Sequence, residues 1–111
     1  MDIELKRQYL AALRSNKYKQ CFNIARKKGL NGEPDSFCAV GVLYDIIRPD
    51  LWVWLDHPSY GENRYTYDIA NETVEQLKLL LPLNERFKIV DLNDLDHKTF
   101  SEIADYIEEN L

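Results

Sequence analysis

The most apolar run in the chain, residues 35–47, constrains the fold more than any other segment, because a run of this kind has to be buried. Pro34 precedes the run and Pro49 closes it, so it has room for one central element. Apolar side chains recur at helical spacing at Val40, Leu43, Tyr44 and Ile47. With Asp35 or Ser36 as the N-cap, the pattern predicts a buried helix that the other segments pack around. A central strand is the alternative, because Val, Ile, Phe and Tyr favour strands.

Cys38 falls in the first turn of this predicted helix, where the partial positive charge lowers the pKa of a thiol and raises its reactivity. A cysteine nucleophile also needs a base, and the chain has two histidines, His57 and His97. Cys38 with either histidine is therefore a candidate catalytic set. The competing interpretation is a core position, because no motif ties a histidine to Cys38 and cysteine is common as a small buried residue.

A chain of 111 residues has the length of one domain, so residues 1–111 are expected to form a single globular unit. No apolar run approaches the ~20 residues that cross a membrane, and charged residues interrupt the opening segment where a secretory signal would be apolar. Two cysteines, Cys21 and Cys38, are too few for a disulfide scaffold. We therefore expect a cytoplasmic protein with free thiols and no membrane association.

The net charge of −5 is unevenly distributed. Residues 1–30 carry eight Lys or Arg and two acidic residues, a net charge of +6, whereas residues 31–111 carry six and seventeen, a net charge of −11. The basic stretch 17–28, which is predicted either as a short strand or as a helix, could bind nucleic acid with Tyr18 and Phe22 stacking on bases. The overall negative charge argues against a general nucleic-acid binder and suits docking on a partner with a basic patch.

Local signals predict the remaining elements. Amphipathic spacing indicates helices over residues 2–14, 72–81 and 84–95, and from Thr99 to the end of the sequence. Thr99 and Glu102 have the capping-box spacing. Residues 51–55 and 64–69 have strand composition and are predicted to pair as a hairpin. The predicted fold class is α+β: a small, mostly helical single domain of four to five helices with a short β-hairpin.

Aromatic and polar side chains gather in and beside the predicted hairpin. Loops on a rigid scaffold commonly carry binding sites, and tryptophan is a frequent binding anchor. One of the two tryptophans is expected to complete the core and the other to lie on the surface. The candidate binding residues are Trp52, Trp54, His57, Tyr60, Arg64, Tyr65 and Tyr67.

No metal or cofactor is predicted. Residues 91–102 match part of an EF-hand loop, but Leu95 and Asp96 stand where that loop needs a ligand and a glycine. The cysteines and histidines lack the paired spacing of a zinc site, and the sequence has no glycine-rich phosphate loop.

Three blocks of sequence form an ordered pattern: Ala12-Leu13-Arg14-Ser15 with Tyr18-Lys19-Gln20, then residues 37–43, then Leu92-Asn93-Asp94 with residues 100–108. This pattern resembles a family of short phage and bacterial proteins that have no assigned activity, with a core like "CCLGVLCD" and a closing "LND…SFxEIADxIE". Ala39 and Tyr44 stand where those proteins often have cysteines, which leaves Cys38 alone and counts against a shared thiol or metal role. The resemblance implies a phage or prophage origin but no reaction.

These features favour a non-enzymatic phage accessory protein that binds a host or defence protein, working in the host cytoplasm. The small size, the acidic body and the absence of a convincing catalytic set motivate this expectation. One alternative is a cysteine-dependent enzyme that uses Cys38. Another is a protein that sequesters a small ligand or nucleotide in a pocket formed by aromatic residues and Arg64.

Overall fold

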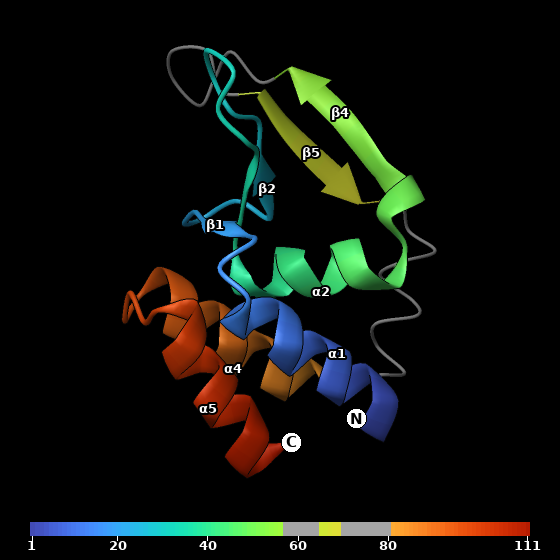
Figure 1. The fold of residues 1–111 in the computed structure, drawn as a ribbon, viewed down its shortest axis with the longest axis vertical. Helices are drawn as coiled ribbons and strands as arrows, with labels where there is room; N and C mark the ends of the chain where they lie inside the picture. The colour runs from blue at the N-terminus through green and yellow to red at the C-terminus, as the bar shows by residue number, and fades with distance from the viewer. Residues whose placement is uncertain (57–64, 70–80) are drawn as a thin grey trace.

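The computed structural model describes residues 1–56, 65–69 and 81–111, with residues 51, 53–56 and 65–69 as backbone alone. Its elements, in chain order, are α1 (Ile3–Arg14), β1 (Lys19–Gln20), β2 (Arg26–Lys27), β3 (Ser36–Phe37), α2 (Ala39–Ile47), the 3₁₀ turn η1 (Pro49–Leu51), β4 (Trp52–Asp56), β5 (Tyr65–Ile69), α4 (Leu83–Asp94) and α5 (Phe100–Asn110). Helix α2 lies between the strands and the other labelled helices (Figure 1). The predicted α+β, mostly helical fold class is confirmed. The helix predicted over residues 72–81 falls on residues that, apart from Leu81, lie outside the described part of the chain.

The strands form one mixed sheet in the order β1-β3-β2-β5-β4. Strands β1 and β3 pair in parallel, and the other neighbours pair antiparallel. The register of β4 with β5 runs from Trp52 opposite Ile69 to Asp56 opposite Tyr65, so the predicted hairpin pairing is confirmed. The basic stretch 17–28 contributes two short strands, and its helical interpretation was wrong.

The prediction for the central run was right for its larger part and wrong for its beginning. Residues 39–47 form α2, but Ser36 and Phe37 form β3, where their backbone pairs with β1 on one side and β2 on the other. Pairing on both sides gives the backbone groups of Ser36 and Phe37 hydrogen-bond partners. The N–H groups in the first turn of a helix have no such partners within the helix. The N-cap is therefore Cys38, whose sulfur accepts a hydrogen bond from the Gly41 N–H at 3.3 Å, and neither Asp35 nor Ser36.

Gly41 explains how α2 lies so close to the sheet. A Cβ atom at this position would lie 1.9 Å from the Ala25 carbonyl oxygen, far inside contact distance. The Cys38 N–H donates to that same oxygen at 3.1 Å. Only glycine lets the helix approach this segment so closely.

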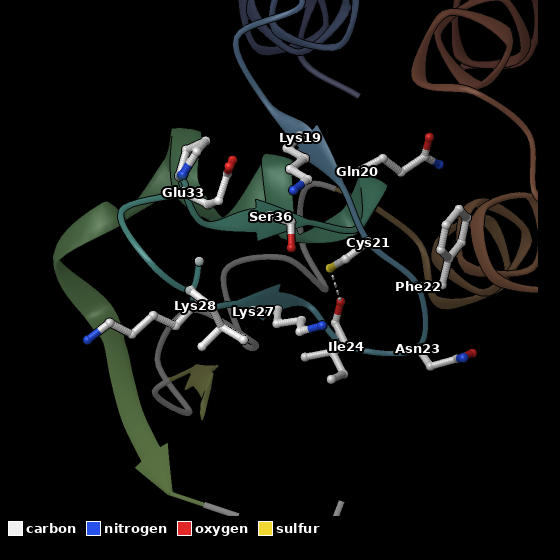
Figure 2. A pocket seen from close by; sticks show the side chains of 13 residues that line it. Lys19, Gln20, Cys21, Phe22, Asn23, Ile24, Lys27, Lys28, Glu33 and Ser36 are labelled. Atoms are coloured by element: carbon white, nitrogen blue, oxygen red, sulfur yellow. Dashed lines mark hydrogen bonds between the residues drawn. The ribbon is translucent and has the colours of Figure 1, made fainter. Parts of the chain in front are cut away.

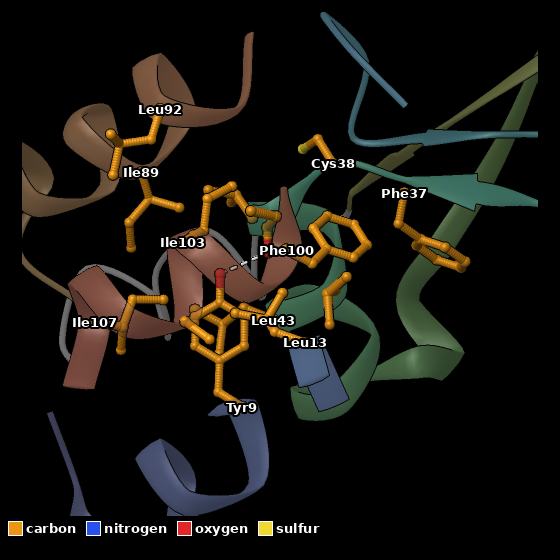
Figure 3. Packing of buried hydrophobic residues seen from close by; sticks show 14 of the residues in the cluster. Tyr9, Leu13, Phe37, Cys38, Leu43, Ile89, Leu92, Phe100, Ile103 and Ile107 are labelled. Atoms are coloured by element: carbon orange, nitrogen blue, oxygen red, sulfur yellow. Dashed lines mark hydrogen bonds between the residues drawn. The ribbon is translucent and has the colours of Figure 1, made fainter. Parts of the chain in front are cut away.

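The core lies between α2 and the helices α1, α4 and α5 (Figure 3). Its largest fully buried apolar side chains are Tyr9, Leu43, Leu81, Ile89, Ile103 and Ile107. The Tyr9 hydroxyl donates to the Ala39 carbonyl oxygen at 2.6 Å, which gives its polar tip a partner inside the core. Tyr9 and Leu13 come from the buried face of α1, so this predicted helix and its apolar face are confirmed.

The helices at the C-terminal end also agree with their sequence signals. The capping box of α5 is complete: Thr99 Oγ1 accepts from the Glu102 N–H, and Glu102 Oε1 accepts from the Thr99 N–H, both at 3.1 Å. Helix α4 covers nearly the whole predicted range, and Asn93 and Asp94 belong to its last turn.

Asn93 joins the helical layer to the sheet. Its side-chain oxygen accepts from the Ala39 N–H at 3.1 Å and from Gln20 Nε2 at 2.8 Å. Its side-chain nitrogen donates to the Cys21 carbonyl at 3.0 Å and to the Asp94 carboxylate at 2.7 Å. Asn93 is 0% exposed. This buried amide therefore fixes β1 and the start of α2 to α4 at one point.

Candidate functional site

Trp52, one of the predicted contact residues, makes contacts within the fold. Its indole nitrogen donates to the Asp45 carboxylate at 3.0 Å, and its ring meets Phe37 and Tyr44 edge-on, with centroid distances of 6.1 Å. The guanidinium carbon of Arg26 lies 5.4 Å from the Trp52 ring centroid. Trp52 thus packs against the core, as was predicted for one of the two tryptophans.

The structure locates only some of the other predicted contact residues. Trp54, Tyr65 and Tyr67 belong to β4 and β5, where the register pairs Trp54 with Tyr67. His57, Tyr60 and Arg64 lie outside the described residues. The structure therefore brings Trp54 and Tyr67 together as strand partners and leaves the rest of the predicted aromatic surface as a prediction.

Cys38 does not have the environment of a nucleophile. Its side chain is 7% exposed within the core cluster. Burial raises the pKa of the Cys38 thiol to about 12, and the Gly41 N–H bond offsets only part of this effect. The expected lowering of this pKa by the helix start was wrong, because the cost of desolvating a thiolate exceeds the benefit of one backbone donor.

His97 has a structural position in the turn between α4 and α5. It adopts a left-handed backbone conformation, with φ of 51°. Its ring stacks on Phe22, with a centroid distance of 4.7 Å. Among the hydrogen bonds and ring contacts of the described residues, none joins His97 to Cys38. The geometry therefore does not assemble these two residues into a nucleophile and base.

A cleft with a volume of about 480 Å³ opens beside the three short strands (Figure 2). It lies against β1, β2 and β3, the loop after β1, and residues 28–34 that lead to β3. Its volume is in the range of small-molecule sites, which is about 300 to 1,000 Å³. Much of its lining comes from the basic stretch 17–28, which was predicted from the sequence as a possible nucleic-acid surface and not as a small-molecule site.

The charged side chains around the cleft are mainly basic. Lys19, Lys27 and Lys28 line it with one acidic residue, Glu33, which gives a formal charge of +2. In the part of the chain that the structure describes, neither Lys19 nor Lys27 forms an ion pair. The neighbouring Arg26, in contrast, does not line the cleft, and its guanidinium pairs with the Asp35 carboxylate at 2.9 Å. The cleft therefore has cationic groups available for an anion.

Ser36 and Cys21 form the inner surface of the cleft and are 7% and 9% exposed. The Cys21 sulfur donates to the Ile24 carbonyl oxygen at 3.4 Å. Burial raises the pKa of the Cys21 thiol, while the Ser36 hydroxyl and the Lys27 charge lower it by less. The net direction keeps this thiol protonated, so the cleft offers hydrogen-bonding and charged groups and no activated nucleophile.

The aromatic residues of the basic stretch do not form a stacking platform together. The Tyr18 hydroxyl donates to the Asp45 carboxylate at 2.8 Å, and its ring packs edge-on against Phe37 at 5.0 Å. Phe22 lines the cleft but stacks on His97. The Tyr18 and Phe22 rings thus pack against different parts of the fold. This arrangement disfavours the nucleic-acid interpretation of the stretch 17–28.

The structure shows a small α+β fold with a basic cleft of about 480 Å³ beside its three short strands. No family model matches the chain, and no curated protein or solved structure gives a significant match to it. Within the described ranges, no helix is both long enough and apolar enough to span a membrane. Nor do three or more His, Cys, Asp or Glu side chains of the described residues come together as a metal-binding group.

Proposed function

We propose that the protein acts by non-covalent binding and that its cleft holds a small anionic ligand. The observation that carries this proposal is the presence of Lys19 and Lys27 on one concave surface, without an ion pair among the described residues. Ammonium groups gathered in a cleft attract anions more strongly than the same groups on a convex surface. This proposal keeps the ligand-sequestering alternative and moves its site from Arg64 to the short strands.

The state of the two thiols supports binding over cysteine catalysis. Burial raises the pKa of both Cys21 and Cys38, so both remain protonated near neutral pH. A cysteine enzyme needs the thiolate. A cytoplasmic location is part of the proposal, because two free thiols suit a reducing compartment.

Thermal unfolding with a series of small phosphates and carboxylates at low salt tests the anion site. A ligand at a hundredfold excess over its Kd stabilises the folded state by about 2.7 kcal/mol, which raises Tm by roughly 10 °C in a domain of this size. We expect the double variant Lys19→Gln/Lys27→Gln to lose this shift. The charge-matched control Lys17→Gln/Lys88→Gln should retain it, since neither residue lines the cleft. A series without any concentration-dependent shift would refute the proposal.

Binding of a host or defence protein through the aromatic segment is the second candidate function, together with a phage or prophage origin. Two observations favour it: β4 is at the edge of the sheet, and its Trp54 is the strand partner of Tyr67. Edge strands and aromatic anchors both occur at protein interfaces.

An affinity pull-down from host lysate, followed by titration of the purified partner, tests this second function. Trp54→Ala should weaken the complex at least tenfold. The control Phe87→Ala removes an aromatic side chain that is 58% exposed on α4, away from the hairpin, and should bind normally. A partner whose affinity is the same for both variants would count against the aromatic surface.

A further inference from the structure

The strand register gives the cationic groups of the cleft a specific order. Strand β3 lies between β1 and β2, and Ser36 is in register with Lys19 on one side and Lys27 on the other. Residues in register on neighbouring strands project from the same face of a sheet. The three side chains line the same cleft, with Lys19 extending over Ser36 in Figure 2. The result is a row of ammonium, hydroxyl and ammonium across three strands.

The spacing of this row suits a single compact anion. Neighbouring strands are about 4.8 Å apart, so the backbones of Lys19 and Lys27 are separated by roughly 10 Å. Lysine carries its charge on a flexible four-carbon chain with three donors, and two such chains can converge on one group between them. The Ser36 hydroxyl adds a donor at the base of the gap.

Charge and oxygen number favour a phosphate monoester over other biological anions. A phosphate monoester carries a charge of about −1.5 to −2 at pH 7 and has three terminal oxygens, one for each member of the row. A carboxylate or a phosphate diester carries a single charge and uses only one of the two ammonium groups fully.

The remaining volume indicates a ligand larger than phosphate. Beyond the row, the cleft is bordered by the apolar side chains of Ile24, Leu30 and Pro34. Glu33 also borders the cleft, where it disfavours a second anionic group and can accept hydrogen bonds from hydroxyl or amino groups. These surroundings suit one terminal phosphate on an otherwise uncharged body.

We propose that the row formed by Lys19, Ser36 and Lys27 binds the terminal phosphate of a small phosphate monoester, with the size of a nucleoside monophosphate. The proposal rests on the anion-binding function above and names the ligand class of that site. The body of the ligand, a nucleoside or a sugar, lies against the apolar border of the cleft.

Isothermal titration at low salt with four probes tests the proposal: adenosine 5′-monophosphate, glucose 6-phosphate, the diester adenosine 3′,5′-cyclic monophosphate and adenosine. At pH 7.5 at least one monoester should bind ten times more tightly than the diester, and adenosine should not bind. The monoester affinity should increase several-fold from pH 5 to pH 7.5, because the second ionisation of the phosphate is near pH 6. Which monoester binds more tightly then distinguishes a nucleoside from a sugar body.

Variants connect this binding to the row. Losing one charged hydrogen-bond partner typically weakens binding about tenfold, so Lys19→Gln and Lys27→Gln should each reduce monoester affinity by that factor. Ser36→Ala should reduce it several-fold, and Lys17→Gln should leave it unchanged. An unchanged Tm confirms that each lysine variant is folded, and Lys27→Arg, which keeps the charge, should retain most of the affinity.

Two results would overturn the proposal in distinguishable ways. If the diester and simple carboxylates bind as tightly as the monoesters, with no increase above pH 6, the monoester class is wrong while the anion-binding function stands. If no anion binds at all, both proposals fail.

Discussion

Replacing Asn93 with leucine should destabilise the protein by about 4 kcal/mol. The Asn93 side chain is 0% exposed and makes four hydrogen bonds. Leucine fills a similar volume but leaves two buried backbone groups without these partners, the Ala39 N–H and the Cys21 carbonyl. A buried group that loses its partner costs about 1–3 kcal/mol, so two such groups account for the expected loss.

Urea unfolding followed by circular dichroism measures this loss. With a slope of about 1.5 kcal/mol per M, the midpoint should fall by roughly 2.5 M. The matched control is Asn110→Leu. Asn110 is exposed, and its side chain makes one hydrogen bond, to the Tyr106 carbonyl at 2.8 Å. Its loss should change stability by less than about 0.5 kcal/mol.

A second substitution, Asn93→Asp, separates hydrogen bonding from packing. The aspartate keeps the two acceptor bonds but loses the donor to the Cys21 carbonyl, and at neutral pH it places a charge in a buried site beside Asp94. Lowering the pH protonates the new carboxyl group, which can then donate to that carbonyl. The variant should therefore be less destabilised at pH 4 than at pH 7, relative to the wild type. A leucine variant that loses under about 1 kcal/mol, or an aspartate variant indifferent to pH, would refute the role given to Asn93.

Three more predictions concern the core. Tyr9→Phe should cost about 1 kcal/mol in thermal unfolding, because it removes the 2.6 Å bond to the Ala39 carbonyl. Gly41→Ala should destabilise by about 2 kcal/mol or more, although alanine favours helices, because its Cβ would lie 1.9 Å from the Ala25 oxygen; a gain in Tm would contradict the close approach. The pKa of Cys38 is raised to about 12 from an ordinary value of 9, so the unfolded chain loses this proton first. The free energy of unfolding should fall between pH 9 and pH 12 by about 1 kcal/mol per pH unit, and this part of the slope should be absent in Cys38→Ala.

Elements with local signals were predictable from the sequence. Helix α1 has an apolar stripe, and α5 has both a stripe and a capping box, and both helices formed close to their predicted bounds. The hairpin was likewise predictable from strand composition. The strands β1, β2 and β3 have two residues each, too few to show the alternation by which a strand is recognised. Their pairing depends on partners elsewhere in the chain, so the start of the central run was assigned to the helix.

The sequence indicates the charged residues of the candidate site but not how the fold brings them together. The cations of the stretch 17–28 were recognised from the sequence. Ser36, however, was interpreted as a helix cap, and nothing local indicates that it separates Lys19 from Lys27 across three strands. The aromatic pattern predicted a binding surface at Trp52 and the residues after it, but Trp52 itself packs against the core. A site built by strand register cannot be located until the register is known.

The packing of α1 against α5 has a consequence for how the chain reaches its fold. Arg14 pairs with Asp105, which is 91 positions away in the sequence. Helical domains usually fold within microseconds to milliseconds because most of their contacts are between near neighbours in sequence. In this protein the first and last described helices have to meet across nearly the whole chain, together with a sheet of mixed pairing. Refolding is therefore expected on the millisecond-to-second scale that is usual for β-rich domains.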